Sequence, residues 1–164
     1  MFGQYNLVLP NTNPTSGINY NVLIGHLSGN DAINGSSNTF VGFNAGVNFK
    51  GSNNIAIGDS SGFYATNTSS GNICIGSNSG YDNKRGVHDT TGNKLFIDNS
   101  KTLTPLIWGD FAEDKLKLNG KVGVGNVTTF PITAGSIDIS NYKLFVTGGI
   151  LTEEVRVSLN STWA

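Results

Sequence analysis

The chain has 164 residues, enough for one ordinary domain or two small ones, and only 37% are hydrophobic and 13% charged. A net charge of −1 gives no electrostatic basis for binding nucleic acid. No apolar run approaches the roughly 18 residues of a membrane helix, so membrane insertion is not expected either. The abundant Gly, Asn, Ser and Thr build turns, which favours a chain of short strands and turns.

Residues 1–20 are predicted to form an extended N-terminal lead-in, because Pro10 and Pro14 discourage a helix. This segment lacks the basic start and long apolar stretch of a secretory signal. The end at Trp163-Ala164 favours a chain that is a fragment of a longer protein, truncated at its C-terminus.

Residues 21–81 contain four copies of one phrase: Asn, two residues, Ile or Val, Gly, two residues, Ser or Ala, Gly. The first glycines are Gly25, Gly42, Gly58 and Gly76, so the steps are 17, 16 and 18 residues. A short and nearly fixed period indicates one small unit stacked on copies of itself. Each period is predicted to be one coil of a parallel β-roll, with the first glycine permitting a turn that a side chain would block.

The predicted repeat strands are apolar on both faces, which is typical of parallel strands covered on both sides. We expect the outer pair of each strand to point into the coil. One coil's pair cannot offset the conformational entropy lost by about 17 ordered residues, at roughly 1–2 kcal/mol each. The second face is therefore expected at a contact between identical chains around an axis, although the sequence leaves open which face meets the partner. The residues of the coil core or of this contact between chains are Val22, Ile24, Val41, Ile55, Ile57, Ile73, Ile75, Leu23, Phe40, Ala56 and Cys74.

The period breaks at residues 82–92, which are charged and predicted to be a loop or neck. Residues 93–164 are predicted to form a different β-rich module. Asn93–Ile97 is similar to a degenerate fifth repeat strand, with Asp98 in place of the glycine. Asn119-Gly120 predicts a hairpin between its flanking strands. The candidate strands are Lys94–Asp98, Thr104–Gly109, Lys115–Leu118, Lys121–Val124, Tyr142–Thr147 and Glu154–Leu159, with a short turn at Asp110–Asp114.

Two resemblances follow from these residues. Asn54-Ile-Ala-Ile-Gly58 resembles the head repeats of trimeric autotransporter adhesins, which form a left-handed parallel β-roll in three chains. The phrases Asn93–Asp98, Thr104–Phe111, Asn119–Gly125 and Tyr142–Val157 resemble tail-fibre-like proteins of Bacteroidetes and their phages. Together they imply an all-β homotrimer: a parallel β-roll or solenoid of short repeats joined to an interwoven β-rich neck. They imply a location outside the cell, on a cell surface, virion or tail-like fibre.

The residues give little support for catalysis or metal binding. His26 and His88 have no partner at metal-ligand spacing. The carboxylates come in adjacent pairs, Glu113-Asp114 and Glu153-Glu154, and neighbours on a strand point to opposite faces. We therefore assign no catalytic, metal or cofactor residue and expect no cofactor. Cys74, the only cysteine, is expected to be a small buried apolar residue.

The expected function is a non-enzymatic trimeric fibre or adhesin module that attaches to a surface or a host receptor. Two alternatives remain: a tailspike-like glycan depolymerase with a site between chains, and a passive fibre shaft. The partners are copies of the chain itself and a surface glycan or protein receptor. Packing is the favoured role of Trp108 and Phe111, and also of five aromatic residues that could instead contact a glycan: Phe43, Phe49, Phe63, Tyr64 and Tyr81.

Overall fold

The computed structural model describes residues 7–8, 20–30, 35–47, 49–63, 69–80, 92–127, 129–130, 133–134, 137–138, 143–147 and 150. All regular structure in these residues is β-strand, as the sequence predicts. The chain divides into two compact units, Met1–Asn119 and Gly120–Ala164. The predicted loop at residues 82–92 is therefore not where the contacts divide, because the sheet of the first unit continues beyond it.

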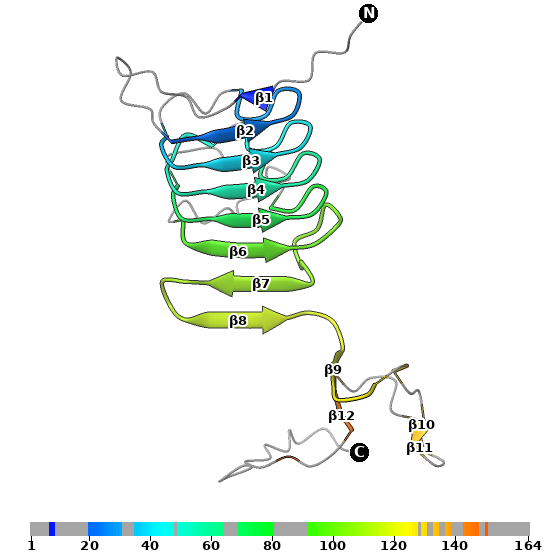
Figure 1. Cartoon of the computed structure of the whole chain (residues 1–164). Coiled ribbons are helices and arrows are strands. Elements are labelled where there is room, and N and C mark those ends of the chain that lie inside the picture. Colours follow the sequence, from blue (N-terminus) through cyan, green and yellow to red (C-terminus); the bar gives the residue numbers. More distant parts are fainter. Residues whose placement is uncertain are drawn as a thin grey trace, which may run out of the picture. The chain divides into compact units, whose positions relative to one another are not determined.

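One eight-stranded sheet organises the first unit, with its strands in chain order (Figure 1). Strands β2 to β6 run parallel and stack one per coil, which makes a solenoid of five coils. Strands β1, β7 and β8 pair antiparallel with their neighbours. The strand bounds are β1 (Leu7–Val8), β2 (Val22–Ile24), β3 (Thr39–Val41), β4 (Ile55–Ile57), β5 (Ile73–Ile75), β6 (Lys94–Ile97), β7 (Ile107–Asp110) and β8 (Lys115–Leu118).

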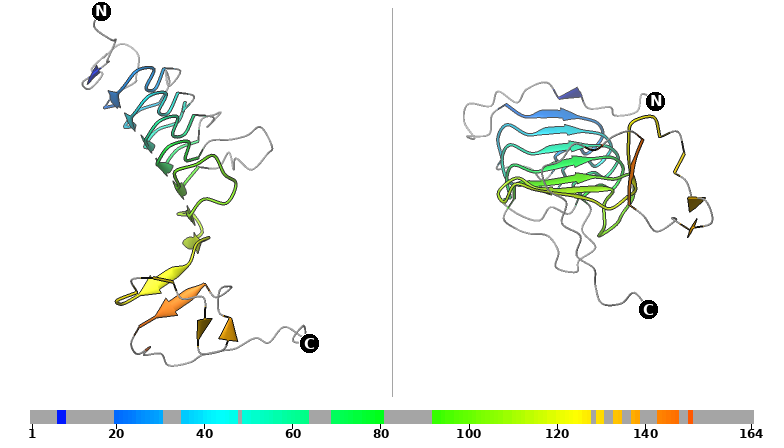
Figure 2. Two further views of the ribbon diagram at one scale, coloured as in Figure 1. Left: turned by 90° about the vertical axis from the view of Figure 1, so that its right-hand side faces the viewer. Right: turned by 90° about the horizontal axis from the view of Figure 1, so that it is seen from below.

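The interior of the solenoid is filled by the middle residue of each repeat strand. Phe40, Ala56 and Cys74 are buried there, as is Phe49 from the return leg of a coil, whose ring stacks on Phe40 at 5.6 Å. Leu23 and Phe96 pack against the two ends of this core. Viewed along the strands, the sheet forms one wall of the coils and the turns lie on the other side (Figure 2).

The expectation that the outer pair of each strand points inward is wrong. Ile57 and Ile75 are 39% and 37% exposed. Ala56 and Cys74, the middle residues of the same two strands, are nearly inaccessible. The reason is the asparagine that precedes each strand, which is also buried. Side chains alternate along a strand, so Asn54 and Ala56 share one face and Ile55 and Ile57 share the other. The recurring asparagine therefore marks the inward face.

The four repeat asparagines form a ladder that joins consecutive coils. The side-chain oxygen of Asn21 accepts from the N–H of Asn38 at 2.8 Å. The same bond links Asn38 to Asn54 at 2.9 Å and Asn54 to Asn72 at 3.0 Å. The side-chain amides donate to return legs, for example from Asn38 to the Gly51 carbonyl at 3.0 Å. Buried polar groups are thereby satisfied without water.

A serine ladder supports the second corner of the coils. The hydroxyl of Ser61 donates to the Cys74 carbonyl of the next coil, and that of Ser79 donates to the Phe96 carbonyl, both at 2.9 Å. Ser28 makes the equivalent bond to Phe40 at 3.1 Å. The second coil has Ala45 at this position, so one hydroxyl of the ladder is missing.

We predict opposite effects for two substitutions in this ladder. Ser61→Ala removes a buried hydrogen bond and should lower the free energy of unfolding by about 1–2 kcal/mol. Ala45→Ser places a hydroxyl where the neighbouring coils carry one and should raise it by about 0.5–1 kcal/mol. Urea denaturation followed by circular dichroism measures both. An unchanged free energy of unfolding in Ser61→Ala would show that the ladder contributes nothing to stability.

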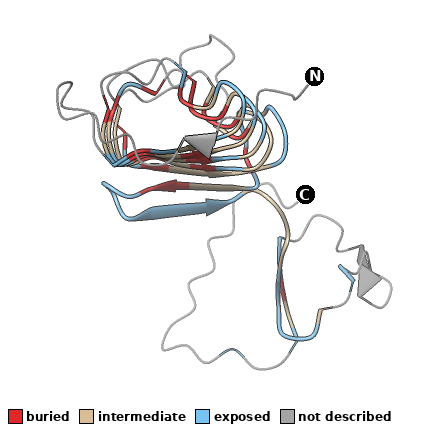
Figure 3. Cartoon of the chain, turned by 45° about the horizontal axis from the view of Figure 1, so that its top comes forward, coloured by how far each residue is buried: buried red, intermediate tan, exposed pale blue. Residues whose placement is uncertain are grey.

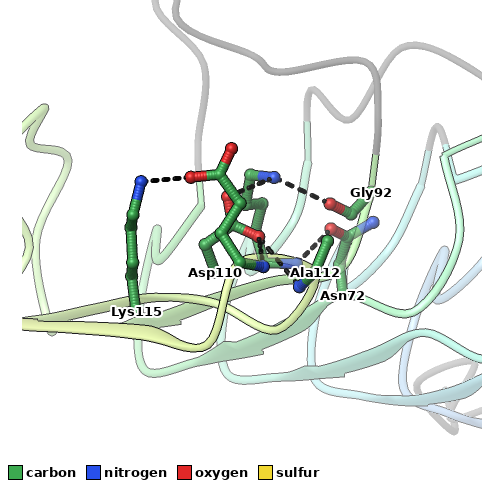
Figure 4. Close-up of polar contacts among 7 residues, drawn as sticks. Asn72, Gly92, Asp110, Ala112 and Lys115 are labelled. Atoms are coloured by element: carbon green, nitrogen blue, oxygen red, sulfur yellow. Dashed lines mark hydrogen bonds and ion pairs between the residues drawn. The ribbon is translucent and has the colours of Figure 1, made fainter.

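The solenoid ends where a buried ion pair replaces the asparagine. Lys94 lies opposite Asn72 and donates its backbone N–H to the Asn72 side-chain oxygen at 3.1 Å. The Lys94 ammonium contacts Asp110 of β7 at 3.1 Å and donates to the Gly92 carbonyl, also at 3.1 Å. Figure 4 shows the surrounding contacts of Asn72, Gly92 and Asp110. From this point the sheet continues as an antiparallel meander.

The second unit is described by two short strand pairs. Strand β9 (Val122–Val124) pairs parallel with β12 (Leu144–Val146), and β10 (Thr133–Ala134) pairs antiparallel with β11 (Ile137–Asp138). The hairpin predicted at Asn119-Gly120 is wrong, because β8 pairs with β7 and β9 pairs with β12. The Asn119 N–H instead donates to the Leu106 carbonyl at 3.0 Å, which ends the meander. The candidate strand at 154–159 lies outside the described residues.

Candidate functional site

The outward face of the sheet carries two files of mostly aliphatic side chains. In both files, residues in register on neighbouring strands stand side by side. One file is Ile24, Val41, Ile57, Ile75, Ile97, Ile107 and Leu118. The other is Val22, Thr39, Ile55, Ile73, Leu95, Gly109 and Leu116. We call these two files the outer face.

The outer face is apolar and partly accessible along its length. No position of either file is charged, and Thr39 is the only polar side chain. Val22 and Ile24 are each 38% exposed, and Leu116 is 66% exposed. Soluble monomers rarely expose a contiguous apolar surface larger than a few hundred Å². A face built this way across seven neighbouring strands is therefore the strongest candidate for an interface in the described part of the chain.

Strand β8 is an exposed edge of the sheet. All four of its residues are exposed (Figure 3). Leu116 and Leu118 extend the outer face, while Lys115 and Lys117 point to the opposite face of the sheet. Lysines on an edge strand oppose unspecific pairing with further strands. The exposed leucines therefore extend the candidate interface, and the lysines oppose edge-to-edge association.

The repeat glycines lie at the first corner of each coil. Their φ angles are +126° at Gly25, +137° at Gly42, +126° at Gly58 and +109° at Gly76. A Cβ at Gly42 would lie 2.4 Å from the Gly58 carbonyl oxygen of the next coil. The glycines thus serve the close stacking of coils, which is the structural role that the sequence predicts.

The predicted glycan-contact aromatics do not form one site. Phe43 is 49% exposed and stacks on His26 at 5.6 Å, so this pair sits at the corner of neighbouring coils. Phe49 is only 1% exposed and belongs to the core. Phe63 is half-buried at a later corner. Tyr64 and Tyr81 lie outside the described residues.

Sequence reasoning missed the surroundings of Trp108. Trp108 is half-buried beside a pocket of about 340 Å³ on the inward face of the meander. It stands in register between Phe96 of β6 and Lys117 of β8. The repeat period ends before this region, so no spacing in the sequence marks it. Only the alternation of Trp108 and Lys117 within their strands could have placed them on one face.

The shifted or paired titratable groups Cys74, Glu113 and Lys115 have structural surroundings. Burial raises the pKa of Cys74 to about 12, as expected for a thiol in the apolar core. Glu113 pairs with Lys115 on the exposed turn that joins β7 to β8. Within the ranges that the structure describes, no three His, Cys, Asp or Glu residues gather as metal ligands. Glu153 and Glu154 lie outside those ranges.

Two aspartates of the meander carry lowered pKa values. The Lys94 hydrogen bond holds the pKa of Asp110 below its ordinary 3.8, against the opposing effect of desolvation. The N–H groups of Ala112 and Glu113 act in the same direction. The hydroxyl of Ser100 is the main cause of the lowered pKa of Asp98, whose other oxygen accepts from the Leu106 N–H at 2.7 Å.

We predict that the meander loosens in acid. A lowered folded-state pKa stabilises the fold above the unfolded value, and this contribution is lost as the pH falls through the folded value. The loss should therefore occur below about pH 4. In a Trp163→Phe background, Trp108 fluorescence during an acid titration reports this loss of stability.

The Asp110→Asn variant tests the assignment to Asp110. It should be less stable than the parent at neutral pH and should lose less stability than the parent on acidification. An acid profile identical to that of the parent would contradict the assignment to Asp110.

No helix among the described residues is long and apolar enough to cross a membrane. Comparison of the chain with protein-family models, with curated proteins and with solved structures finds no match.

Proposed function

We propose that this chain is a non-enzymatic module of an extracellular homotrimeric fibre, which attaches to a cell surface or host receptor. The observation that supports the proposal is the outer face: two files of mostly aliphatic side chains that run in register from β2 to β8. The resemblance of the repeats to trimeric adhesin heads suggests three chains. In this arrangement the outer faces of three copies pack against one another.

Physical reasoning favours a copy of the same chain as the partner. Fully burying a Val, Ile or Leu side chain stabilises by roughly 1.5–3 kcal/mol relative to leaving it exposed. The outer face carries twelve such residues between β2 and β8. Each is already ordered by its strand, so little further conformational entropy is lost on association. A flat face without charge also suits the packing of sheet on sheet.

Attachment by three chains gains from multivalency. Three equivalent weak sites held on one rigid module raise the overall avidity without any strong single site. A solenoid with a regular hydrogen-bond ladder is a stiff support for such sites. This combination fits an attachment module better than a catalytic one, which needs converging acid, base or nucleophilic groups.

The mass in solution tests the proposal. The expected particle is three times 17.3 kDa, or about 52 kDa, by light scattering during gel filtration. Ile57→Lys combined with Ile75→Lys places two charges on the outer face and should convert the particle to single chains. Asp59→Lys is the matched control, since Asp59 is exposed at the corner that follows the same strand. A folded single chain of the unaltered protein in dilute buffer would overturn the proposal.

A further inference from the structure

The inward face of the meander is a continuation of the solenoid interior. Within the coils, the file Leu23, Phe40, Ala56, Cys74 and Phe96 faces the interior. After β6 the same file continues as Trp108 and then Lys117. The core file thus reaches a half-exposed tryptophan and an exposed lysine, beside a pocket of about 340 Å³.

The pocket has an apolar wall on each side. Phe96 and Trp108 of neighbouring strands line it from the sheet. Leu103 and Pro105 line it from the segment that joins β6 to β7. Leu103 is 63% exposed, so the segment does not close over Trp108 as a core would. A tryptophan ring that remains accessible beside a pocket can stack on a flat ligand.

Three polar groups of the pocket differ in what they can offer a ligand. The Lys94 ammonium is paired with Asp110 and bonded to Gly92, so its charge is compensated. The Asn119 side-chain amide donates to the Pro105 carbonyl, which fixes the amide and leaves its oxygen as an acceptor. Lys117 is exposed and forms no ion pair within the described ranges. Lys117 therefore supplies the uncompensated positive charge at this pocket.

These groups select one ligand chemistry. An aromatic ring stacks on the C–H face of a pyranose, and an amide oxygen accepts from a sugar hydroxyl. An ammonium ion pairs with a carboxylate. A neutral sugar would leave Lys117 without a counter-charge, and a purely apolar ligand would leave the Asn119 oxygen unused. A sugar ring that bears a carboxylate matches all three groups, and the volume lies in the range of small-ligand pockets.

We propose that the pocket of Trp108, Lys117 and Asn119 binds a uronic acid unit of an acidic polysaccharide. The pyranose ring stacks on Trp108, its carboxylate pairs with the Lys117 ammonium, and a hydroxyl donates to the Asn119 oxygen. The inference rests on the proposed attachment function for its biological meaning, and it gives that function a receptor class. The pocket is built entirely from residues of the first compact unit.

Fluorescence titration of the full chain tests the site directly. Trp108 becomes the only tryptophan in a Trp163→Phe background, so it reports its own contacts. Glucuronate should change its emission saturably, with a dissociation constant of about 1–10 mM for so small a ligand. Glucose should bind more weakly, and acetate at equal concentration should cause no saturable change. Equal responses to glucuronate and glucose, or to glucuronate and acetate, would overturn the proposal.

Two lysine variants separate the site from general charge. Lys117→Gln should weaken glucuronate binding about three- to tenfold and leave glucose binding unchanged. Lys50→Gln, at an exposed position away from the pocket, should bind glucuronate like the parent. Circular dichroism confirms that each variant is folded. Unchanged glucuronate binding by Lys117→Gln would sink the proposal, as would the absence of any saturable response. The mass of the parent, measured on the same sample, reports separately whether the homotrimer forms.

Discussion

Replacing Gly58 by alanine is expected to unfold the solenoid at a markedly lower urea concentration. Gly58 has φ +126°, a conformation that L side chains rarely adopt and that costs about 1–3 kcal/mol at a single residue. A Cβ there would also lie 2.7 Å from both the carbonyl carbon and the oxygen of Gly76. Neither coil can move away freely, because the Gly58 N–H donates to Val41 and the Gly76 N–H donates to Ile57, each at 2.8 Å. The expected loss is about 3–5 kcal/mol.

The neighbouring residue provides the control for Gly58→Ala. The Asp59 side chain is exposed and accepts from the Ser60 hydroxyl at 2.7 Å. Asp59→Ala should therefore change the free energy of unfolding by no more than about 0.5 kcal/mol. Both variants are compared at equal protein concentration, since association would shift the midpoint. If Gly58→Ala and Asp59→Ala unfold at the same urea concentration, close coil contact is not what the glycine provides.

The coil architecture could be predicted from the sequence because glycine recurs at each position where the backbone must turn tightly. Gly25 and its three counterparts mark the corners where neighbouring coils touch. The fifth strand was also predictable from Asn93–Ile97: β6 pairs parallel with β5, and the Asp98 N–H donates to the Ile75 carbonyl at 3.1 Å. Cys74 is buried as expected. In each case a local residue type reports a local physical requirement.

Alternation alone could not show which face of each strand points into the coil, because both faces are apolar. Apolar content favours the Ile55 and Ile57 pair as the core, yet Ala56 takes that place. The face of Ala56 points inward because the buried Asn54, on the same face, forms a hydrogen bond with the next coil. This bond joins residues far apart in the sequence, so local alternation does not reveal it. The Trp108 pocket was likewise hidden, since it forms where the chain stops coiling and begins a meander. The trimer and its receptor stay predictions.

Interrupting the asparagine ladder is expected to be the second large effect. Asn54 is fully buried. Its oxygen accepts from the Asn72 N–H at 3.0 Å, and its amide donates to the Ser69 carbonyl at 3.2 Å. Asn54→Leu keeps the number of side-chain heavy atoms but leaves both backbone groups unpaired. Each buried unpaired group costs about 1–3 kcal/mol, so the free energy of unfolding should fall by about 2–6 kcal/mol in urea denaturation.

Asn54→Asp distinguishes lost hydrogen bonds from lost shape. The introduced carboxyl keeps an acceptor for Asn72, but its second oxygen faces the Ser69 carbonyl and the Asn38 side-chain oxygen, which both accept. Burial and these acceptors raise its pKa above the ordinary value of about 3.9. The neutral acid can donate one bond, so the loss of stability should be small in acid and should grow as the pH rises through the raised pKa.

The matched control for Asn54→Asp is the residue before it. Asn53 is exposed with φ +60°, a conformation that aspartate tolerates. Asn53→Asp should therefore unfold like the parent from acid to neutral pH. If the stability of Asn54→Asp followed pH in the same way as that of the parent, its side chain would reach water in the folded state. The asparagine ladder would then not be a water-excluded set of hydrogen bonds that stabilises the stacking of coils.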